Sequence, residues 1–242
     1  MSGASERALV LQHAPTGPPG LLGEWLAERG IPMDVRRLSD GPGGDPVDGP
    51  TADDVDVRDY AMVALLGSRF SPTADGDEPA VQTSRRLVTE AVEHDVPVLG
   101  LCYGGQMLAS VLGGAVERAP RAELGWTSFD SDDPQLVPPS PWLAWHWYRF
   151  TVPPGATEIA RNDVGPQAFR HGRHVGVQFH PESTIEIVRN WAEKDAPRLA
   201  AEGVPDGPAL LERGRDHAPQ AAANARTFFD GFWQQARNGR SK

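Results

Sequence analysis

The sequence has almost no cysteine, no long apolar run and a shortage of positive charge. Only Cys102 of its 242 residues is a cysteine, which excludes an internal disulfide framework and a thiolate metal cluster. No stretch approaches the roughly 18 uninterrupted apolar residues of a transmembrane helix. Residues 1–7 lack the apolar core of a signal peptide. We therefore expect a protein of the cytoplasm without a membrane partner.

Acidic side chains outnumber basic ones by 33 to 23, which gives a formal net charge of -10. An acidic surface repels phosphate backbones, so nucleic acid is not expected as a partner. The histidines are scattered, and the neighbouring His171 and His174 lack a matching third and fourth ligand, so no metal site is expected. No nucleotide-binding glycine motif such as G-x-x-x-x-G-K-[ST] is present, and no cofactor is predicted.

The composition that remains is that of a folded protein with many turns. Hydrophobic residues make up 39% of the chain, and it contains 26 glycines and 23 prolines, more than the usual share of turn-forming residues. The length fits one large domain or two small ones. Because no internal repeat, low-complexity tract or convincing linker is found, residues 1–242 are predicted to form a single domain.

Short apolar runs alternate with helical patterns along the first half of the chain. Four such runs predict buried strands, at residues 8–11, 33–38, 60–66 and 96–101. Apolar residues at helical spacing predict three helices, at residues 21–29, 84–94 and 103–112. This alternation indicates an α/β fold with a mostly parallel central sheet flanked by helices.

The second half of the chain has a different character. Strand-like pieces at residues 150–152, 167–170 and 175–179 predict antiparallel additions to the sheet. Residues 183–240 are predicted to be helical, with an interruption near residues 203–208. The many Gly, Pro and Asp residues at 40–54 predict a surface loop.

Cys102 lies between a predicted strand and a predicted helix, as the nucleophile does in a nucleophile elbow. Gly100 and Gly104, two residues before and after it, would keep such a strained turn free of clashes. The helix N-terminus favours a thiolate, and the N–H of Tyr103 is placed to bind an oxyanion. A buried packing cysteine is the alternative, but the glycine spacing favours a reactive thiol.

A cysteine nucleophile needs a base, and His180 lies where the predicted strand 175–179 ends. Pro181 stops that strand, and the carboxylate of Glu182 could hold the imidazole in the required tautomer. A surface histidine beside a solvated glutamate is the alternative. The position of His180 after a buried-looking strand favours the base.

Two segments resemble the signatures of the class I, triad-type glutamine amidotransferase family. Residues 100–106 resemble its motif G-x-C-x-G-x-Q, and residues 176–182 resemble its motif G-x-Q-F-H-P-E. The opening Leu11-Gln12-His13 with Pro19-Gly20, and the segment at residues 123–126, are similar to the stand-alone, GMP-synthase-like branch. The resemblance covers nearly the whole chain and implies a Rossmann-like α/β glutaminase fold.

The resemblance also implies an activity. Cys102 would attack the side-chain amide of glutamine, His180 and Glu182 would complete the triad, and a γ-glutamyl thioester would be hydrolysed to glutamate after ammonia leaves. Gln106 matches the family glutamine at the substrate site; a helix-surface residue is the alternative. Because the chain has no room for a synthetase domain, the ammonia is expected to reach a separate partner synthetase or to be released.

The chain departs from the family pattern after its third predicted strand. Where the family usually carries G-G-P, this sequence has Gly67-Ser68-Arg69. The backbone N–H groups of Gly67 and Ser68 are still predicted to contribute to an oxyanion hole. Arg69 either binds a substrate carboxylate or points to solvent.

A second departure makes the predicted pocket more aromatic. Where the branch often has W-H-x-D, this chain has Trp145-His146-Trp147-Tyr148. Trp145 and His146 are predicted to contact substrate; packing of the aromatic cluster against the C-terminal helices is the alternative. These departures leave open a γ-glutamyl hydrolase acting on γ-glutamyl amides. A catalytically silent binding protein is a third possibility, against which the intact Cys102, His180 and Glu182 argue.

Overall fold

The computed structural model describes residues 6–38, 52, 54–139, 141–204 and 207–238, so most of the predicted loop 40–54 lies outside the described residues. Its centre is an eight-stranded sheet in the order β2-β1-β3-β4-β10-β9-β8-β6. The parallel strands are β1 (Ala8–Gln12), β2 (Met33–Arg37), β3 (Met62–Leu65), β4 (Val98–Leu101) and β10 (His174–Val177). The antiparallel strands are β9 (Pro166–His171), β8 (Thr157–Arg161) and β6 (Asp130–Ser131). This arrangement confirms the predicted mostly parallel sheet with antiparallel additions.

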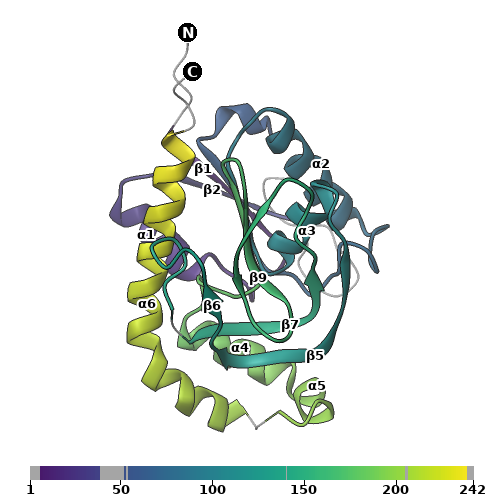
Figure 1. The fold of residues 1–242 in the computed structure, drawn as a ribbon, viewed down its shortest axis with the longest axis vertical. Coiled ribbons are helices and arrows are strands. Elements are labelled where there is room, and N and C mark those ends of the chain that lie inside the picture. Colours follow the sequence, from purple (N-terminus) through teal and green to yellow (C-terminus); the bar gives the residue numbers. More distant parts are fainter. Residues whose placement is uncertain (1–5, 39–51, 53, 140, 205–206, 239–242) are drawn as a thin grey trace.

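Helices cover both faces of the parallel half of this sheet, which explains why β3 and β4 in its middle contain no polar side chain. On one side lie α1 (Gly20–Glu28) and α6 (Gly207–Asn238), and on the other lie α2 (Pro79–Glu93), α3 (Tyr103–Val111) and the short 3-10 helix η1 (Val57–Asp59) (Figure 1). Alternate residues of a strand point to opposite faces. Ala8 and Val10 therefore pack with α1 and α6, while Leu9 and Leu11 pack with α2 and α3.

A separate two-stranded ribbon, β5 (Val116–Thr127) with β7 (Trp142–Phe150), lies beside this sheet (Figure 1). The predicted strand at 150–152 is wrong beyond Phe150, because that residue ends the long strand β7. Helices α4 (Ile185–Lys194) and α5 (Ala196–Ala201) pack on the ribbon through a third apolar cluster. The cluster contains Leu143, Trp145, Trp147, Val188, Ala192, Leu199 and Leu210.

The C-terminal helices agree with the predicted helical segment 183–240 and its interruption near 203–208. The long helix α6 docks on α1, where Trp25 Nε1 donates a 3.1 Å hydrogen bond to Asp230 Oδ1 and the two rings Trp25 and Phe229 lie 5.7 Å apart. Arg226 of α6 also pairs with Glu28 of α1. That the whole chain is one domain stays a prediction.

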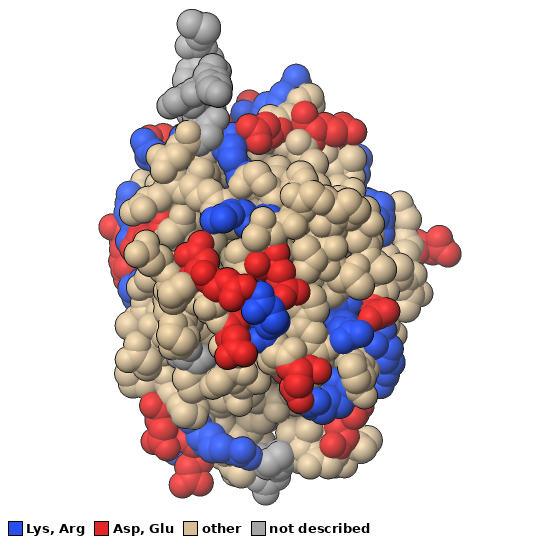
Figure 2. All heavy atoms as spheres, viewed as in Figure 1, with Lys and Arg blue, Asp and Glu red and all other residues tan. Residues whose placement is uncertain are grey.

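The surface carries charges of both signs. On the face seen in Figure 2, acidic and basic side chains lie interspersed rather than gathered into separate areas. Of the helices that the structure describes, none is long and apolar enough to cross a membrane.

Candidate active site

Cys102 occupies a strained turn between β4 and α3. Its backbone has φ 52° and ψ -105°, and holding a non-glycine residue in such a region costs of order 1–3 kcal/mol. The surrounding structure fixes the turn: the Cys102 N–H donates to Val177 O at 2.9 Å, and its carbonyl accepts from the Gln106 N–H at 3.0 Å. Strand β10 therefore holds the elbow from the side.

The glycines around the elbow allow backbone contacts that no side chain would permit. A Cβ at Gly100 would overlap the carbonyl oxygen of Gly104, and a Cβ at Gly104 would overlap the carbonyl oxygen of Leu65. The structure thus gives the steric reason expected for small residues at these two positions. The turn brings the first residues of α3 close to the end of β3.

His180 and Glu182 form a buried pair beside this elbow. His180 Nδ1 lies 2.7 Å from Glu182 Oε1, and both side chains are less than 5% exposed. The backbone N–H of His180 donates to Leu143 O at 2.8 Å, and the Trp191 ring lies edge-on at 4.7 Å. Nε2 has no hydrogen-bond partner within the described part of the chain, so one face of the imidazole is anchored and the other nitrogen is available.

The electrostatics of the pair favour a charged imidazole. Burial lowers the pKa of His180, but the Glu182 carboxylate and the neighbouring Cys102 sulfur outweigh it and raise the pKa to about 10. Gly67 shows how close the two reactive groups are: a Cβ there would lie 2.8 Å from His180 Cε1 and 3.9 Å from Cys102 Cβ. The structure therefore brings Cys102, His180 and Glu182 together, as the sequence predicted.

The three predicted oxyanion residues belong to two segments, the start of α3 and the loop after β3. Tyr103 is the first residue of α3, so its N–H belongs to the first-turn groups that have no partner within the helix. Gly67 and Ser68 follow β3, and Ser68 Oγ accepts from the Phe70 N–H at 3.2 Å, which fixes the bend of this loop. The Tyr103 side chain points away into the core, where burial raises its pKa and its ring lies 4.6 Å from that of His13.

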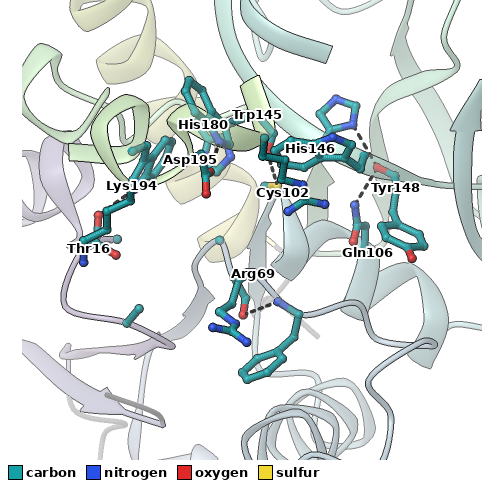
Figure 3. Close-up of a pocket in the computed structure, with 18 of the residues that line it drawn as sticks. Thr16, Arg69, Cys102, Gln106, Trp145, His146, Tyr148, His180, Lys194 and Asp195 are labelled. Atoms are coloured by element: carbon teal, nitrogen blue, oxygen red, sulfur yellow. Dashed lines mark hydrogen bonds between the residues drawn. The ribbon is translucent and has the colours of Figure 1, made fainter. Parts of the chain in front are cut away.

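Cys102, His180, Gly67 and Ser68 border a cavity of about 440 Å³. Figure 3 shows Cys102 near its centre, Lys194 and Thr16 on one side, and Gln106 and Tyr148 on the other. The walls come from residues 14–17, 67–70 and 145–148 and from α4 and α5. Trp191 Nε1 donates to Thr16 O at 2.7 Å and so joins two walls that are far apart in the sequence.

Gln106 and Arg69, both predicted to contact substrate, line this cavity in different ways. Gln106 is 3% exposed, and its Nε2 donates to Tyr148 O at 2.9 Å and to Gln178 Oε1 at 3.2 Å. Because both amide hydrogens are used, Gln106 has only its carbonyl oxygen left to offer. Arg69 is exposed, and its guanidinium lies 5.3 Å from the centre of the Phe70 ring.

Trp145 and His146 also line the cavity, but both side chains are engaged with the protein. Trp145 Nε1 donates to Asp195 Oδ2 at 2.9 Å, and its ring lies 5.9 Å from that of Trp191. The His146 ring turns towards β5, with Nε2 3.1 Å from Glu123 Oε2. Trp145 therefore packs on the C-terminal helices and also borders the cavity, while its contact with substrate stays a prediction.

Three residues of the site were not predicted from the sequence: Gln178 beside the sulfur, and Trp191 and Asp195 in the wall of the cavity. Gln178 is fully buried, and its Nε2 lies 3.8 Å from Cys102 Sγ. The sequence does contain a signal for Gln178, which precedes His180 by two residues. In an extended chain, side chains two residues apart point to the same side. Trp191 and Asp195 reach the site only because α4 folds onto β7, which no local pattern reveals.

No group of three or more His, Cys, Asp or Glu side chains within the described ranges could hold a metal ion. The neighbouring rings of His171 and His174 lie 6.4 Å apart and stacked. His174 Nδ1 accepts a hydrogen bond from the Val98 N–H at 3.2 Å, which occupies that nitrogen with the backbone.

The chain matches the family model "Glutamine amidotransferase class-I" over residues 56–190, which is more than half of its length. This protein belongs to the class I glutamine amidotransferase family. The matched range contains Cys102, His180 and Glu182, and the fold of the family agrees with the observed mostly parallel sheet flanked by helices.

Several known proteins are similar to this chain. A GMP synthase (glutamine-hydrolyzing) of Thermus thermophilus is 33% identical over 164 residues, which cover 61% of this chain and 30% of the relative. The same enzyme of Aeropyrum pernix is 40% identical over 108 residues, 39% of this chain and 21% of the relative. This chain thus matches less than a third of the length of these curated relatives.

Solved structures of glutamine amidotransferases match almost the full chain. One from Thermotoga maritima has a TM-score of 0.80 at 25% identity and covers 94% of this chain and 98% of its own. One from Methylobacillus flagellatus has a TM-score of 0.81 at 26% identity, with 96% and 95% covered. These likenesses support the class I amidotransferase fold well beyond the range that the family model matches.

Proposed function

We propose that this protein hydrolyses the side-chain amide of glutamine through a cysteine thioester. The observation that carries the proposal is the strained Cys102 beside a histidine whose Nδ1 is held by Glu182 at 2.7 Å and whose Nε2 has no partner among the described residues. A base oriented by a buried carboxylate, with its second nitrogen available, is the arrangement that activates a nucleophile. Membership of the amidotransferase family supports glutamine as the substrate.

The chemistry follows from these positions. The Cys102 thiol gives its proton to His180, and the thiolate attacks the amide carbon; the oxygen that becomes negative accepts hydrogen bonds from the backbone N–H groups of Tyr103, Gly67 and Ser68. His180 gives that proton to the departing nitrogen, so that ammonia leaves and a γ-glutamyl thioester remains. His180 then takes a proton from the water that attacks the thioester, and returns it to the sulfur as glutamate leaves and the free thiol is restored. Glu182 stabilises the imidazolium in both steps.

Where the ammonia goes is a separate part of the proposal. The GMP synthases are matched over less than a third of their length, so the rest of such an enzyme has no counterpart among these 242 residues. We infer that a separate synthetase uses the ammonia, or that it is released. The absence of nucleic-acid, membrane and cofactor partners and a cytoplasmic location remain predictions.

The γ-glutamyl hydrolase alternative is favoured by the size and charge of the cavity. Glutamine has ten non-hydrogen atoms, which would occupy about 300 Å³ even at the roughly 30 Å³ that liquid water allots to each molecule. The cavity measures about 440 Å³, and Arg69, Lys194 and Arg198 line it. Arg198 stacks on the Trp147 ring at 3.4 Å. A γ-glutamyl amide with a larger, acidic leaving group would use this extra space and charge.

Release of ammonia from glutamine, compared with release of amine or amino acid from γ-glutamyl amides, separates these functions. We expect glutamine turnover that disappears in Cys102→Ala and in His180→Gln and persists in the matched control His171→Gln, which changes a histidine outside the cavity. Turnover of γ-glutamyl amides alone would support the alternative instead.

A partner-dependent glutaminase could be silent in that assay, so a covalent test is also needed. An electrophilic chloroketone analogue of glutamine should label the protein once, and only at Cys102, because the chain has no other cysteine. The label should disappear in Cys102→Ala. A protein that neither turns over any γ-glutamyl compound nor accepts this label would be the silent binding protein, and the proposal would be wrong.

A further inference from the structure

A buried chain of side-chain contacts leads from Glu123 on β5 to the sulfur of Cys102. It passes through His146, the carbonyl of Tyr148, Gln106 and Gln178. We propose that this chain orients Gln178 so that an N–H donor, rather than a carbonyl oxygen, faces the nucleophile. Gln178 thereby stabilises the thiolate, and Gln106, His146 and Glu123 are positioning residues that act through it.

The orientation of each amide is decided by the group before it. The Tyr148 carbonyl can only accept, so the Gln106 atom 2.9 Å from it must be the nitrogen. That nitrogen also donates to Gln178 at 3.2 Å, so the Gln178 atom there must be the oxygen. The Gln178 nitrogen is then the atom 3.8 Å from Cys102 Sγ. Turning either amide over would break its preceding hydrogen bond.

The start of this chain of contacts is the buried His146 ring, which lies between Tyr148 O and Glu123. The Tyr148 carbonyl accepts a second hydrogen bond from His146 Nδ1 at 3.0 Å, and His146 Nε2 lies 3.1 Å from Glu123 Oε2. Both side chains are at most 6% exposed. Because Nδ1 must carry a hydrogen to reach a carbonyl, the contact with Tyr148 O fixes which way the His146 ring is turned.

Other donors support the charge of Glu123. Asn162 Nδ2 donates to Oε1 at 2.6 Å, and Gln167 Nε2 donates to Oε2 at 2.7 Å. Burial raises the pKa of Glu123, but its contacts with His146, Asn162 and Gln167 outweigh this and lower the pKa overall. Gln167 also contacts the other end of this chain of contacts, since its backbone carbonyl accepts a hydrogen bond from the backbone N–H of Gln178 at 2.8 Å. Both ends of the chain of contacts are therefore fixed.

The consequence at the sulfur depends on its ionisation state. The Cys102 thiol can donate to Trp145 O, 3.8 Å away, but a thiolate has no hydrogen to offer and gains nothing from that carbonyl. The side-chain amide of Gln178 donates a hydrogen to the sulfur, which offsets part of the cost of burying a negative charge. A carbonyl oxygen in the same place would repel the thiolate. The chain of contacts from Glu123 to Gln178 therefore favours the thiolate form of Cys102.

Alkylation of the single cysteine by iodoacetamide tests this proposal without any need for glutamine turnover. In Gln178→Glu, which keeps the shape but removes the donor, we expect the alkylation rate at neutral pH to fall at least tenfold. The rate-against-pH profile should move to higher pH by about one unit or more. Gln178→Met, which removes the donor without adding charge, should move the profile in the same direction by a smaller amount. Gln234→Glu, the same change at an exposed position of α6, should leave it unchanged.

The anchor is tested with a pair of glutamates on one strand. Glu123→Gln should slow alkylation two- to fivefold and move the pH profile upwards, whereas Glu117→Gln, on an exposed part of β5 paired with Arg149, should have no effect. Thermal unfolding and circular dichroism establish that each variant is folded. Folded Gln178→Glu and Gln178→Met proteins with the wild-type profile would overturn the proposal. A shifted profile in a protein that never turns over glutamine would overturn only the proposed function.

Discussion

Replacing Gly67 with alanine should disable the candidate site without removing any reacting group. The new Cβ would lie 2.8 Å from His180 Cε1, and an ordinary contact between carbon atoms needs about 3.4 Å or more. The ring must therefore move by roughly 0.6 Å or tilt. The backbone of Gly67 is outside the left-handed region and alanine keeps the N–H, so the contact with the ring is the effect that remains.

His180 has little freedom to give way. Its Nδ1 is held by Glu182, its N–H by Leu143 O, and its ring by Trp191. A misplacement of about 1 Å costs on the order of 100-fold in rate. We expect kcat/KM for glutamine to fall about 10- to 100-fold, which is a loss of about 1.4–2.7 kcal/mol of transition-state stabilisation. Overpacking should lower the free energy of unfolding by about 1–3 kcal/mol.

Steady-state release of ammonia and the rate of labelling by the chloroketone analogue would measure this loss. Gly76→Ala is the matched control, because its Cβ would meet only backbone oxygens at 3.5 and 3.6 Å, an ordinary contact distance, and its residue lies outside the cavity. A Gly67→Ala protein with wild-type kcat/KM and wild-type labelling would refute the idea that the position of the His180 ring is fixed and functionally important.

Three further changes should have measurable effects. Glu182→Gln removes the group that raises the pKa of His180 to about 10. In the wild type, the contribution of this ion pair to the free energy of unfolding is complete below about pH 6.5 and fades as pH rises towards 10. The difference in stability between the wild type and the variant should therefore shrink over that range. Burial lowers the pKa values of His13 and His174 to about 4, so the unfolded state binds more protons between pH 6.5 and 4. Stability should fall as pH drops through that window by up to about 3 kcal/mol per histidine. Arg69→Gln should reduce kcat/KM for γ-glutamyl amides with acidic leaving groups by up to about tenfold at low salt and less at high salt, because the side chain is exposed.

Each of these has a simple control. Urea unfolding at a series of pH values measures the first two, and a wild type whose stability does not change between pH 6.5 and 4 would contradict the second. His174→Asn should remove part of that acid sensitivity. Arg58→Gln, an exposed arginine outside the cavity, is the control for Arg69. Equal losses in the two arginine variants, or an equal loss with uncharged leaving groups, would argue against an anion contact.

The parallel half of the fold is predictable from sequence because each of its inner strands is a short apolar run that can be recognised within a few neighbouring residues. β1 and β3 are apolar at every position that faces a helix layer, and turn residues bound each run. The ribbon of β5 and β7 is harder to predict, since β5 contains Pro120, exposed charges and a register shift between Arg118 and Glu123. Its pairing joins residues that are 15 to 34 positions apart, which a short sequence window does not include.

The reactive residues are predictable for a different reason. The glycines around Cys102 and the run His180-Pro181-Glu182 are consequences of tight geometry, so the sequence itself carries the constraint. The side-chain direction of His146 is not predictable in this way. It depends on Glu123 lying directly opposite in the β5–β7 ladder, and that register follows from tertiary packing rather than from the local pattern.

The hydrogen bond from the Cys102 N–H to Val177 O has a consequence for the order in which the protein is synthesised. β10 supplies that carbonyl and lies between β4 and β9 in the sheet, although it is the last of the described strands to leave the ribosome. A nascent chain that ends before residue 175 thus carries a cysteine with neither its base nor a completed elbow. We therefore expect Cys102 to acquire its folded surroundings only after synthesis has passed Glu182.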